Sequence, residues 1–281
     1  MVRRSGKNCG RAFSKVGFFL LKLLRLFLTI MVCVVFIADG CGIRTRSRIM
    51  GGYQAAPHSW PWQVTLMTPD REPFCGGTLL DEFWIATASH CLNYLREGDV
   101  IVRAGTHHRT KINKWVQDLR VRPIYRHPKY NDPVMFANDV ALLLLDRPVQ
   151  LNSAVRPICL PDKDDKPGTD CTVTGWGRLG HSGTHPDFLM QVTIPIVPYS
   201  TCQKIYPGDV HESMLCGGHL EGGKDACVGD SGRPYVCEHK NHIWKLEGIV
   251  SWGYGCGWEN NLGVYTNVTH VRGWIKSVSH I

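Results

Sequence analysis

The sequence predicts a globular protein that contains short β-strands and is cross-linked by disulfides. Its 281 residues are 43% hydrophobic and 20% charged, a composition that provides a substantial core and argues against disorder. Residues 59–66 and 74–80 are short runs between turn residues, the pattern expected of β-strands. Twelve cysteines, with no Cys-x-x-Cys pair and no zinc-like Cys/His spacing, fit disulfides formed in an oxidising compartment better than metal ligands.

The first 40 residues have the pattern of a secretory signal peptide. Basic residues precede an uninterrupted apolar run from Leu26 to Ala38, which is short for a membrane span but typical of a signal sequence. Ala38 and Gly40 are small residues at the two positions that a signal peptidase reads. We therefore expect cleavage before Cys41.

A signal anchor over residues 16–38 is the alternative, and it would hold the protein in the membrane with type II topology. We favour the signal peptide and expect a secreted, extracellular protein. Removal of Cys9 and Cys33 with that peptide leaves ten cysteines, an even number.

The formal net charge of +8 is concentrated near the N-terminus. Residues 1–48 contain ten Lys and Arg and one acidic residue, which leaves 22 basic and 23 acidic residues in 49–281. A nearly neutral domain offers no basic groove, so we expect no nucleic-acid partner.

A basic segment containing Arg44, Arg46 and Arg48 ends directly before Ile49-Met50-Gly51-Gly52. Exposed segments of this kind are favoured sites of proteolysis, so we expect processing between Arg48 and Ile49. The chain would then consist of a signal peptide (1–40), a propeptide or light chain (41–48) and a main domain (49–281).

Gly229-Asp230-Ser231-Gly232 is a candidate for nucleophilic chemistry. Glycines permit a sharp turn that exposes the serine hydroxyl and aims backbone N–H groups at a developing oxyanion. The same four residues are also ordinary turn composition. The decision between these interpretations depends on residues upstream.

His90 and Asp139 are those upstream residues. A histidine beside a cysteine is more often structural than catalytic, and Cys75 with Cys91 could be only a local cross-link. Asp139 directly precedes an apolar strand at 140–145, where a buried carboxylate could orient an imidazole ring.

Four motifs occur in the order and spacing of the chymotrypsin/trypsin family of serine proteases, and the chain resembles that family over residues 41–281. The motifs are residues 49–52, 87–91, 138–143 and 229–232. Four independent motifs in one order make the resemblance highly specific. It implies an all-β fold of two antiparallel β-barrels (trypsin-like) with a C-terminal helix, and an active site in the cleft between the barrels.

The resemblance implies a role for each candidate residue. Ser231 attacks the peptide carbonyl, His90 takes and returns the proton, and Asp139 fixes His90. The backbone N–H groups of Gly229 and Ser231 form the oxyanion hole. The implied reaction is peptide-bond hydrolysis through an acyl-enzyme, without a cofactor.

Activation is implied in the same way. Cleavage after Arg48 frees the amine of Ile49, which pairs with Asp230 and brings the pocket into its working geometry. The activator would be a trypsin-like protease or the chain itself. The other implied partners are protein or peptide substrates and protein inhibitors, and we expect a monomer.

The specificity implied by the resemblance is for Arg or Lys. Asp225 stands at the position that resembles the floor of the primary pocket of trypsin, where a carboxylate pairs with a substrate cation. Gly253 and Gly263 leave the pocket walls open. The strand that includes Ser251, Trp252 and Gly253 would bind the substrate as an added β-strand.

Five disulfides are implied by the resemblance. The pairs are Cys41–Cys159, Cys75–Cys91, Cys171–Cys237, Cys202–Cys216 and Cys227–Cys256. The first would keep residues 41–48 attached after cleavage. The cysteine count alone could not choose this connectivity.

Local features add three expectations. Residues 57–64 and 215–223 look closest, within the family, to the protease domain of plasminogen. Residues 271–281 have a helix-like pattern that should close the domain, and Asn267-Val268-Thr269 is a glycosylation sequon. Residues 105–114 replace the acidic calcium loop of trypsin with basic residues and histidines, so we expect a solvated loop and no metal.

Three departures from the family pattern support a rival interpretation, a non-catalytic binding or signalling domain on the same scaffold. They are Met50 in place of Val, Ser89 in place of Ala and Arg233 in place of Gly. We favour an active enzyme because all three triad residues are present. Since Gly232 can absorb the tight turn, we expect Arg233 to leave Ser231 in position with reduced turnover.

Overall fold

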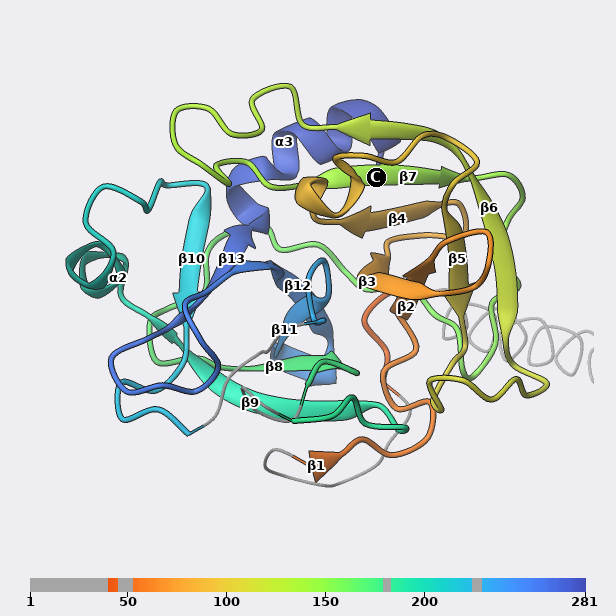
Figure 1. The fold of residues 1–281 in the computed structure, drawn as a ribbon, viewed down its shortest axis with the longest axis horizontal. Coiled ribbons are helices and arrows are strands. Elements are labelled where there is room, and N and C mark those ends of the chain that lie inside the picture. The colour runs from red at the N-terminus through yellow and green to blue at the C-terminus, as the bar shows by residue number, and fades with distance from the viewer. Residues whose placement is uncertain (1–39, 45–52, 179–182, 224–228) are drawn as a thin grey trace, which may run out of the picture. The chain divides into compact units, whose positions relative to one another are not determined.

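The computed structural model describes residues 40–44, 53–178, 183–223 and 229–281 (Figure 1). The chain divides into two units, residues 1–40 and 41–281, and the description below concerns the second. The expected signal peptide or anchor and the expected cleavage site at Arg48 and Ile49 lie outside the described residues, as do Asp225 and Cys227. Within the described ranges we find no helix with the length and apolar character that a membrane span requires.

Six antiparallel strands of the N-terminal half form a closed barrel, with the order β2-β3-β4-β7-β6-β5 (Figure 1). Their bounds are β2 Gln63–Met67, β3 Pro73–Leu79, β4 Trp84–Thr87, β5 Ile101–Ala104, β6 Gln117–Arg126 and β7 Ala141–Leu145. β2 begins later than residue 59 because Pro61 has no N–H for a strand ladder, and the Gln63 N–H bonds back to the Trp60 carbonyl at 3.1 Å.

Six strands of the C-terminal half form a second ring, β9-β10-β13-β12-β11-β8, which the pairing of β8 with β9 closes. Their bounds are β8 Asp170–Gly175, β9 Met190–Val197, β10 Met214–Gly217, β11 Pro234–Glu238, β12 Trp244–Trp252 and β13 Gly263–Asn267. The two-residue strand β1 (Tyr53–Gln54) adds to β9 at the outer edge. The all-β fold of two antiparallel barrels is therefore confirmed.

Strand β7 shows how apolar burial fixes the position of a site residue. Leu142 and Leu143 are both fully buried, and each such side chain stabilises the fold by about 1.5–3 kcal/mol. Central pairing of β7 with β4 and β6 excludes water from this strand. Because β7 begins two residues after Asp139, its burial determines where that carboxylate enters the protein.

Two α-helices and two 3₁₀ helices complete the described elements. They are α2 (Tyr199–Ile205), α3 (Val268–Ser279), η1 (Ser89–Leu92) and η2 (Lys240–His242). The expected C-terminal helix is confirmed, but it begins three residues before residue 271. The Asn267 side chain accepts a hydrogen bond from the His270 N–H at 3.2 Å and caps the helix there, and His280 ends it with a φ of 64°.

Four disulfides join described cysteines: Cys41–Cys159, Cys75–Cys91, Cys171–Cys237 and Cys202–Cys216. These are four of the five implied pairs, and the fifth includes a cysteine outside the described residues. The expected solvated loop at 105–114 is wrong in part, because Thr106 and His107 are buried. The His107 carbonyl accepts hydrogen bonds from Leu189 N–H at 2.9 Å and from Trp176 Nε1 at 3.3 Å, which draw this end of the loop into the core.

One acidic side chain of the second barrel is almost fully buried. Glu247 on β12 is 2% exposed, and burial, followed by the charge of Asp165, raises its pKa to about 8. Its Oε1 lies 3.1 Å from His239 Nε2, which in turn lies 3.3 Å from Asp165 Oδ2. We therefore expect the stability of the fold to depend on the protonation of Glu247.

Candidate active site

His90 lies on η1, directly after strand β4. Its neighbour Ser89 is fully buried, and the Ser89 hydroxyl donates to the Val140 carbonyl at 2.8 Å. This bond ties η1 to the segment that leads into β7. The serine departure from the family pattern thus leaves no unpaired hydroxyl at this position and joins the two segments that carry His90 and Asp139.

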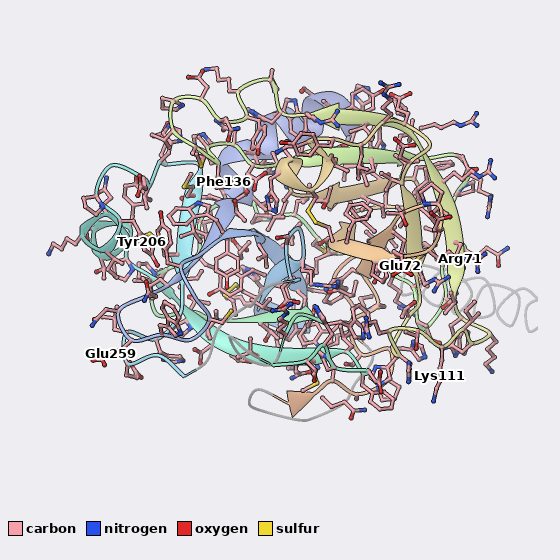
Figure 2. The ribbon with its side chains drawn as sticks, in the orientation of Figure 1. Arg71, Glu72, Lys111, Phe136, Tyr206 and Glu259 are labelled. Atoms are coloured by element: carbon pink, nitrogen blue, oxygen red, sulfur yellow. A yellow bond between two sulfur atoms is a disulfide. The ribbon has the colours of Figure 1, made fainter. Side chains whose placement is uncertain are left out.

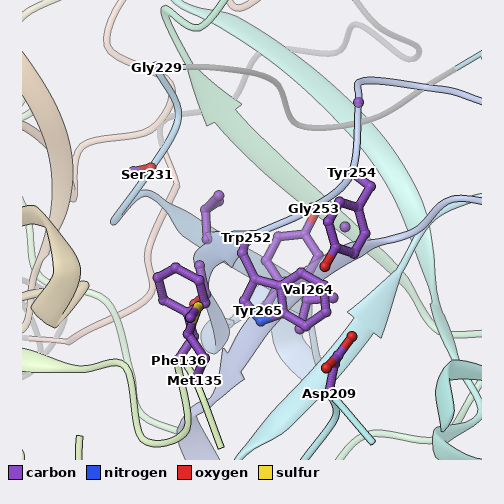
Figure 3. Close-up of a pocket in the computed structure, with 14 residues that line it drawn as sticks. Met135, Phe136, Asp209, Gly229, Ser231, Trp252, Gly253, Tyr254, Val264 and Tyr265 are labelled. Atoms are coloured by element: carbon purple, nitrogen blue, oxygen red, sulfur yellow. The ribbon is translucent and has the colours of Figure 1, made fainter. Parts of the chain in front are cut away.

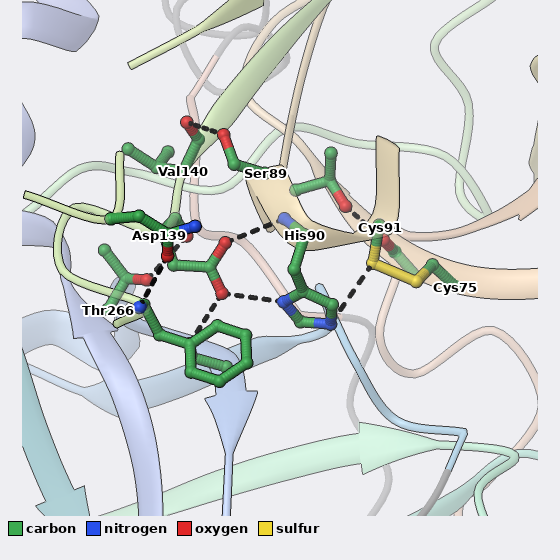
Figure 4. A network of polar contacts seen from close by, with 12 residues as sticks. Cys75, Ser89, His90, Cys91, Asp139, Val140 and Thr266 are labelled. Carbon is green, nitrogen blue, oxygen red and sulfur yellow. Dashed lines mark hydrogen bonds and ion pairs between the residues drawn. A yellow bond between two sulfur atoms is a disulfide. The ribbon is translucent and has the colours of Figure 1, made fainter. Parts of the chain in front are cut away.

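Asp139 is completely buried and accepts three hydrogen bonds on its carboxylate (Figure 4). Oδ2 lies 2.7 Å from His90 Nδ1 and accepts from Ser251 Oγ at 2.6 Å, while Oδ1 accepts from the His90 backbone N–H at 2.9 Å. The Thr266 hydroxyl donates to the Asp139 backbone carbonyl at 2.6 Å. Since Ser251 is on β12 and Thr266 is on β13, the second barrel fixes a carboxylate that the first barrel supplies.

This arrangement determines which nitrogen of His90 can react. Nδ1 faces the carboxylate and donates to it, so Nε2 is the ring nitrogen that can accept a proton. The His90 side chain is 19% exposed and Nε2 lies 3.9 Å from Cys91 Sγ. The ring of Phe136 packs edge-on against His90 with a centroid distance of 5.7 Å, which restricts the ring orientation.

The turn that carries Ser231 is formed by two glycines in the left-handed region, Gly229 at φ 96° and Gly232 at φ 76°. A Cβ at Gly232 would collide with Thr87 Oγ1 and the Gly76 carbonyl. The Ser231 carbonyl accepts from the Gly76 N–H at 2.8 Å, and the Gly232 N–H donates to the Val250 carbonyl at 2.9 Å. The turn is therefore held between β3 of one barrel and β12 of the other.

The disulfide Cys75–Cys91 connects this turn with His90. Cys75 precedes Gly76, which binds the Ser231 carbonyl, and Cys91 follows His90. The serine turn and the imidazole are therefore attached to adjacent, covalently linked parts of the first barrel. Within the described chain no hydrogen bond joins Ser231 Oγ to His90 Nε2, although such bonds often tighten only when substrate is present.

Arg233 is accommodated without backbone strain, because its φ lies outside the left-handed region. The residue is 3% exposed, and its Nε lies 3.1 Å from Asp230 Oδ1 and donates to the Gly229 carbonyl at 3.3 Å. Its guanidinium carbon lies 5.0 Å from the centre of the Trp176 ring. Burial lowers the pKa of Arg233, and the charge of Asp230 opposes that shift.

A cavity of about 630 Å³ opens beside Ser231 (Figure 3). The residues expected at the site that line it are Gly229, Ser231, Ser251, Trp252, Gly253 and Gly263. In Figure 3, Gly229 and Ser231 lie at one end of this group and Asp209 at the other. The structure thus brings these residues together around one cavity.

Sequence reasoning missed three kinds of residue in this cavity. Met135 and Phe136 come from the loop before β7, Tyr254 follows β12, and Asp209 adds a carboxylate. Tyr206, at the end of α2 (Figure 2), packs against Trp252 with a ring-centroid distance of 5.1 Å. The available signal was the apolar run 134–137 in a loop before β7, where Met135 is 71% exposed.

The comparisons with known proteins agree with this geometry. The trypsin family model matches residues 49–275. The chain is 40% identical over 230 residues to serine protease 1 of Rattus norvegicus, which covers 82% of this chain and 89% of that protein. It is 40% identical over 231 residues to anionic trypsin of Canis lupus familiaris, with coverage of 82% and 89%.

Mannan-binding lectin serine protease 1 of Homo sapiens is also 40% identical, over 265 residues that cover 86% of this chain and 38% of that protein. The expected closeness to plasminogen stays a prediction. The family match spans most of the chain and both barrels. The chain belongs to the trypsin family of serine proteases.

Proposed function

We propose that the chain is the secreted zymogen of a trypsin-like endopeptidase that cleaves peptide bonds after Arg or Lys. The observation that carries this proposal is the buried Asp139 carboxylate bonded to His90 Nδ1 at 2.7 Å, beside the glycine turn that exposes Ser231. An imidazole held in this way can act as a general base through its other nitrogen.

In the proposed mechanism Ser231 Oγ attacks the substrate carbonyl while His90 Nε2 takes its proton. The imidazolium returns the proton to the leaving amine, and an acyl-enzyme on Ser231 is then hydrolysed by water. Asp139 holds the ring and stabilises its charged form. No cofactor takes part in these steps.

The backbone N–H groups of Gly229 and Ser231 are the proposed oxyanion donors. Among the described residues, neither of these two N–H groups donates a hydrogen bond to protein. An unpaired N–H beside a nucleophile is available to an oxyanion, and preorganised donors of this kind are a large part of catalysis. Glycine suits position 229 because its φ of 96° lies in the left-handed region and a Cβ there would press against His185.

Specificity for Arg or Lys is assigned to Asp225. Support comes from the position of Asp225 in the sequence and from the 40% identity with trypsins over 82% of the chain. A Cβ added at Gly253 would make only ordinary contacts, with the nearest atom 3.6 Å away, so the wall beside the proposed slot is open. A long substrate cation could then reach a carboxylate at its floor.

Activation is proposed to occur between Arg48 and Ile49 by a trypsin-like protease or by the chain itself. Cys41 is bonded to Cys159, so residues 41–48 would remain attached as a short light chain. The guanidinium of Arg44 also lies 3.7 Å from the centre of the Trp60 ring, which supports a docked position for this segment. We further propose a signal peptide over residues 1–40, with a type II anchor as the alternative, and protein inhibitors as partners.

A second candidate function is a catalytically weakened, protease-like binding domain. The observation in its favour is the missing hydrogen bond between Ser231 Oγ and His90 Nε2 in the described chain. Two observations favour the enzyme. The Ser89 hydroxyl has a hydrogen-bond partner, and the φ of Arg233 lies outside the left-handed region.

Peptide hydrolysis after cleavage at Arg48 tests the proposal. We expect a high kcat/KM for peptides ending in Arg and little activity on matched peptides ending in Phe. The Ser231→Ala protein, cut in the same way, is the control and should be inactive. Absence of hydrolysis by folded, cut protein would favour the binding domain.

A further inference from the structure

A buried arginine lies beside the carboxylate that the expected activation scheme pairs with the Ile49 amine. Arg233 Nε lies 3.1 Å from Asp230 Oδ1, and the Arg233 and Asp230 side chains are 4% and 12% exposed. Arg233 Nη1 is buried and has no hydrogen-bond partner among the described residues. A guanidinium withdrawn from water this completely needs a counter-charge, and Asp230 is the acidic residue in contact with it.

The surroundings of Asp230 are shaped for this contact. Asp230 Oδ1 also accepts from the Gly177 N–H at 2.8 Å. A Cβ at Gly175 or Gly177 would collide with the Asp230 carboxylate, so these glycines leave the space that it occupies. The hydrogen bond from Gly177, the ion pair with Arg233 and the two glycines therefore restrict the orientation of this side chain.

Arg233 also acts directly on the backbone of the nucleophile turn. Its Nε donates to the Gly229 carbonyl at 3.3 Å, and its backbone N–H donates to the Asp230 carbonyl at 3.1 Å. The Gly229 carbonyl belongs to the peptide that lies between the two proposed oxyanion donors, Gly229 N–H and Ser231 N–H. The Arg233 carbonyl in turn accepts from the Val250 N–H at 2.9 Å, which anchors Arg233 to β12.

A glycine at position 233 could make none of these side-chain contacts. In that case Asp230 would lose this ion pair, and the proposed activation would supply a cation through the amine that cleavage creates. We propose that Arg233 is a positioning residue that supplies Asp230 with a cation before cleavage, so that the uncut chain already holds its oxyanion turn in the working arrangement. This inference rests on the proposed function, and cleavage at Arg48 then raises activity without being required for it.

The inference also concerns alkaline pH. A free α-amine has an ordinary pKa of about 7.7–8.0, and pairing with a carboxylate raises it, so an enzyme that depends on the amine loses activity as that group deprotonates. Burial lowers the pKa of the Arg233 guanidinium, but the charge of Asp230 opposes that shift, and we expect the paired guanidinium to keep its proton in that range. Among the described residues, His185 also faces this turn: its Nδ1 lies 2.8 Å from the Trp176 carbonyl oxygen, and a Cβ added at Gly229 would lie 2.8 Å from its ring.

The first experiment uses the full chain with Arg48→Gln, which blocks cleavage, and compares Arg233 with Arg233→Met and Arg233→Lys. We expect the uncut Arg233 protein to hydrolyse Arg peptides and to be titrated by a serine-directed phosphonate. In this background Arg233→Met should lower kcat/KM by at least about a hundredfold, because the buried carboxylate loses its counter-ion, and Arg233→Lys should recover part of the loss. In the cut protein the same Met substitution should cost less than about tenfold, because the amine remains. A purely structural role for Arg233 would lower both backgrounds equally.

The second experiment measures kcat/KM of the cut protein from pH 7.5 to 10.5, with His185→Gln as the control for the neighbouring imidazole. We expect the Arg233 protein to keep its activity above the pH at which Arg233→Met loses it. If Arg233→Met does not fold, the pH profile of the unsubstituted enzyme still tests the inference. Loss of activity as an α-amine deprotonates would contradict it.

Two results overturn the inference. The first is that the cut chain is active while the uncut chain is inactive. The second is that the Arg233 and Arg233→Met proteins lose activity at the same alkaline pH. Inactivity of the cut, folded Arg233 protein would instead contradict the proposed function itself.

Discussion

Replacing Asp139 with asparagine should separate catalysis from stability in this protein. The carboxylate oxygen Oδ2 has two donors, His90 Nδ1 and Ser251 Oγ, and Oδ1 has one, the His90 backbone N–H. An asparagine has one acceptor oxygen and one NH₂ group, so it must place the NH₂ at one of these two positions.

The two placements differ in free energy. If the NH₂ occupies the Oδ1 position, it faces the His90 backbone N–H, so that two donors meet without an acceptor. A buried donor without a partner costs about 1–3 kcal/mol. With the NH₂ at the Oδ2 position, it can donate to His90 Nδ1 and to the oxygen of a rotated Ser251 hydroxyl, while the amide oxygen still accepts from the His90 backbone N–H. The second placement should therefore be favoured by about 1–3 kcal/mol, roughly 5- to 150-fold. It requires the proton of His90 to sit on Nε2, where it blocks the proposed general base.

We therefore expect Asp139→Asn to keep most of its thermal stability and to lose activity. In the triad of this family the same change lowers kcat by about 10⁴-fold, and we expect a loss of the same order here. The assay is kcat on an Arg peptide after cleavage at Arg48, with thermal unfolding of the same sample.

Thr266→Val is the matched control for Asp139→Asn. The Thr266 hydroxyl donates to the Asp139 backbone carbonyl at 2.6 Å and does not touch the carboxylate. Its removal should lower stability by about 1–3 kcal/mol and leave kcat within about tenfold. An Asp139→Asn protein that retains kcat within tenfold of the unsubstituted enzyme would refute the assigned role of Asp139.

Three further predictions concern other parts of the chain. Asp225→Ser should lose on the order of 3–5 kcal/mol of transition-state binding for Arg peptides, since the substrate cation is left unpaired. A strong remaining preference for Arg over Phe peptides would show that another residue sets specificity. Glu247 keeps its proton in the folded state up to a pKa of about 8, whereas the unfolded chain releases it above about 4.5, so stability falls as pH rises between these values. Glu247→Gln should therefore flatten the fall of Tm between pH 5 and pH 8, and an unchanged slope would contradict this cause. Removing the Cys75–Cys91 pair by a double alanine substitution should cost about 3 kcal/mol of stability, because the bond closes a loop with a sequence separation of 16. It should also lower activity, because it loosens the link between the Ser231 turn and His90. Denaturant unfolding measures the first effect and enzyme kinetics the second.

Much of the architecture could be predicted because it depends on local sequence. The apolar run after Asp139 predicted β7, and glycines on both sides of Ser231 predicted a tight turn. The start of α3 was missed, since the cap at Asn267 depends on one side-chain hydrogen bond and not on apolar periodicity.

The contacts that complete the site could not be predicted, because they join residues far apart in sequence. Ser251 reaches Asp139 across 112 positions, and its hydroxyl has no local signal for that bond. Gly232 indicated that the turn could tolerate Arg233, but no local signal indicated that Arg233 pairs with Asp230 in a space left by Gly175 and Gly177. That space results from tertiary packing and cannot be inferred from the order of the residues.

Covalent labelling with a serine-directed phosphonate tests the central claim, that Ser231 is a nucleophile activated by His90. The protein is cut at Arg48, incubated with the reagent and analysed by intact mass and peptide mapping, with Ser231→Ala and His90→Ala as controls. We expect stoichiometric modification on the peptide that contains Ser231 and none in either control. Folded, cut protein that takes up no phosphonate, or takes it up equally with His90→Ala, would contradict the account.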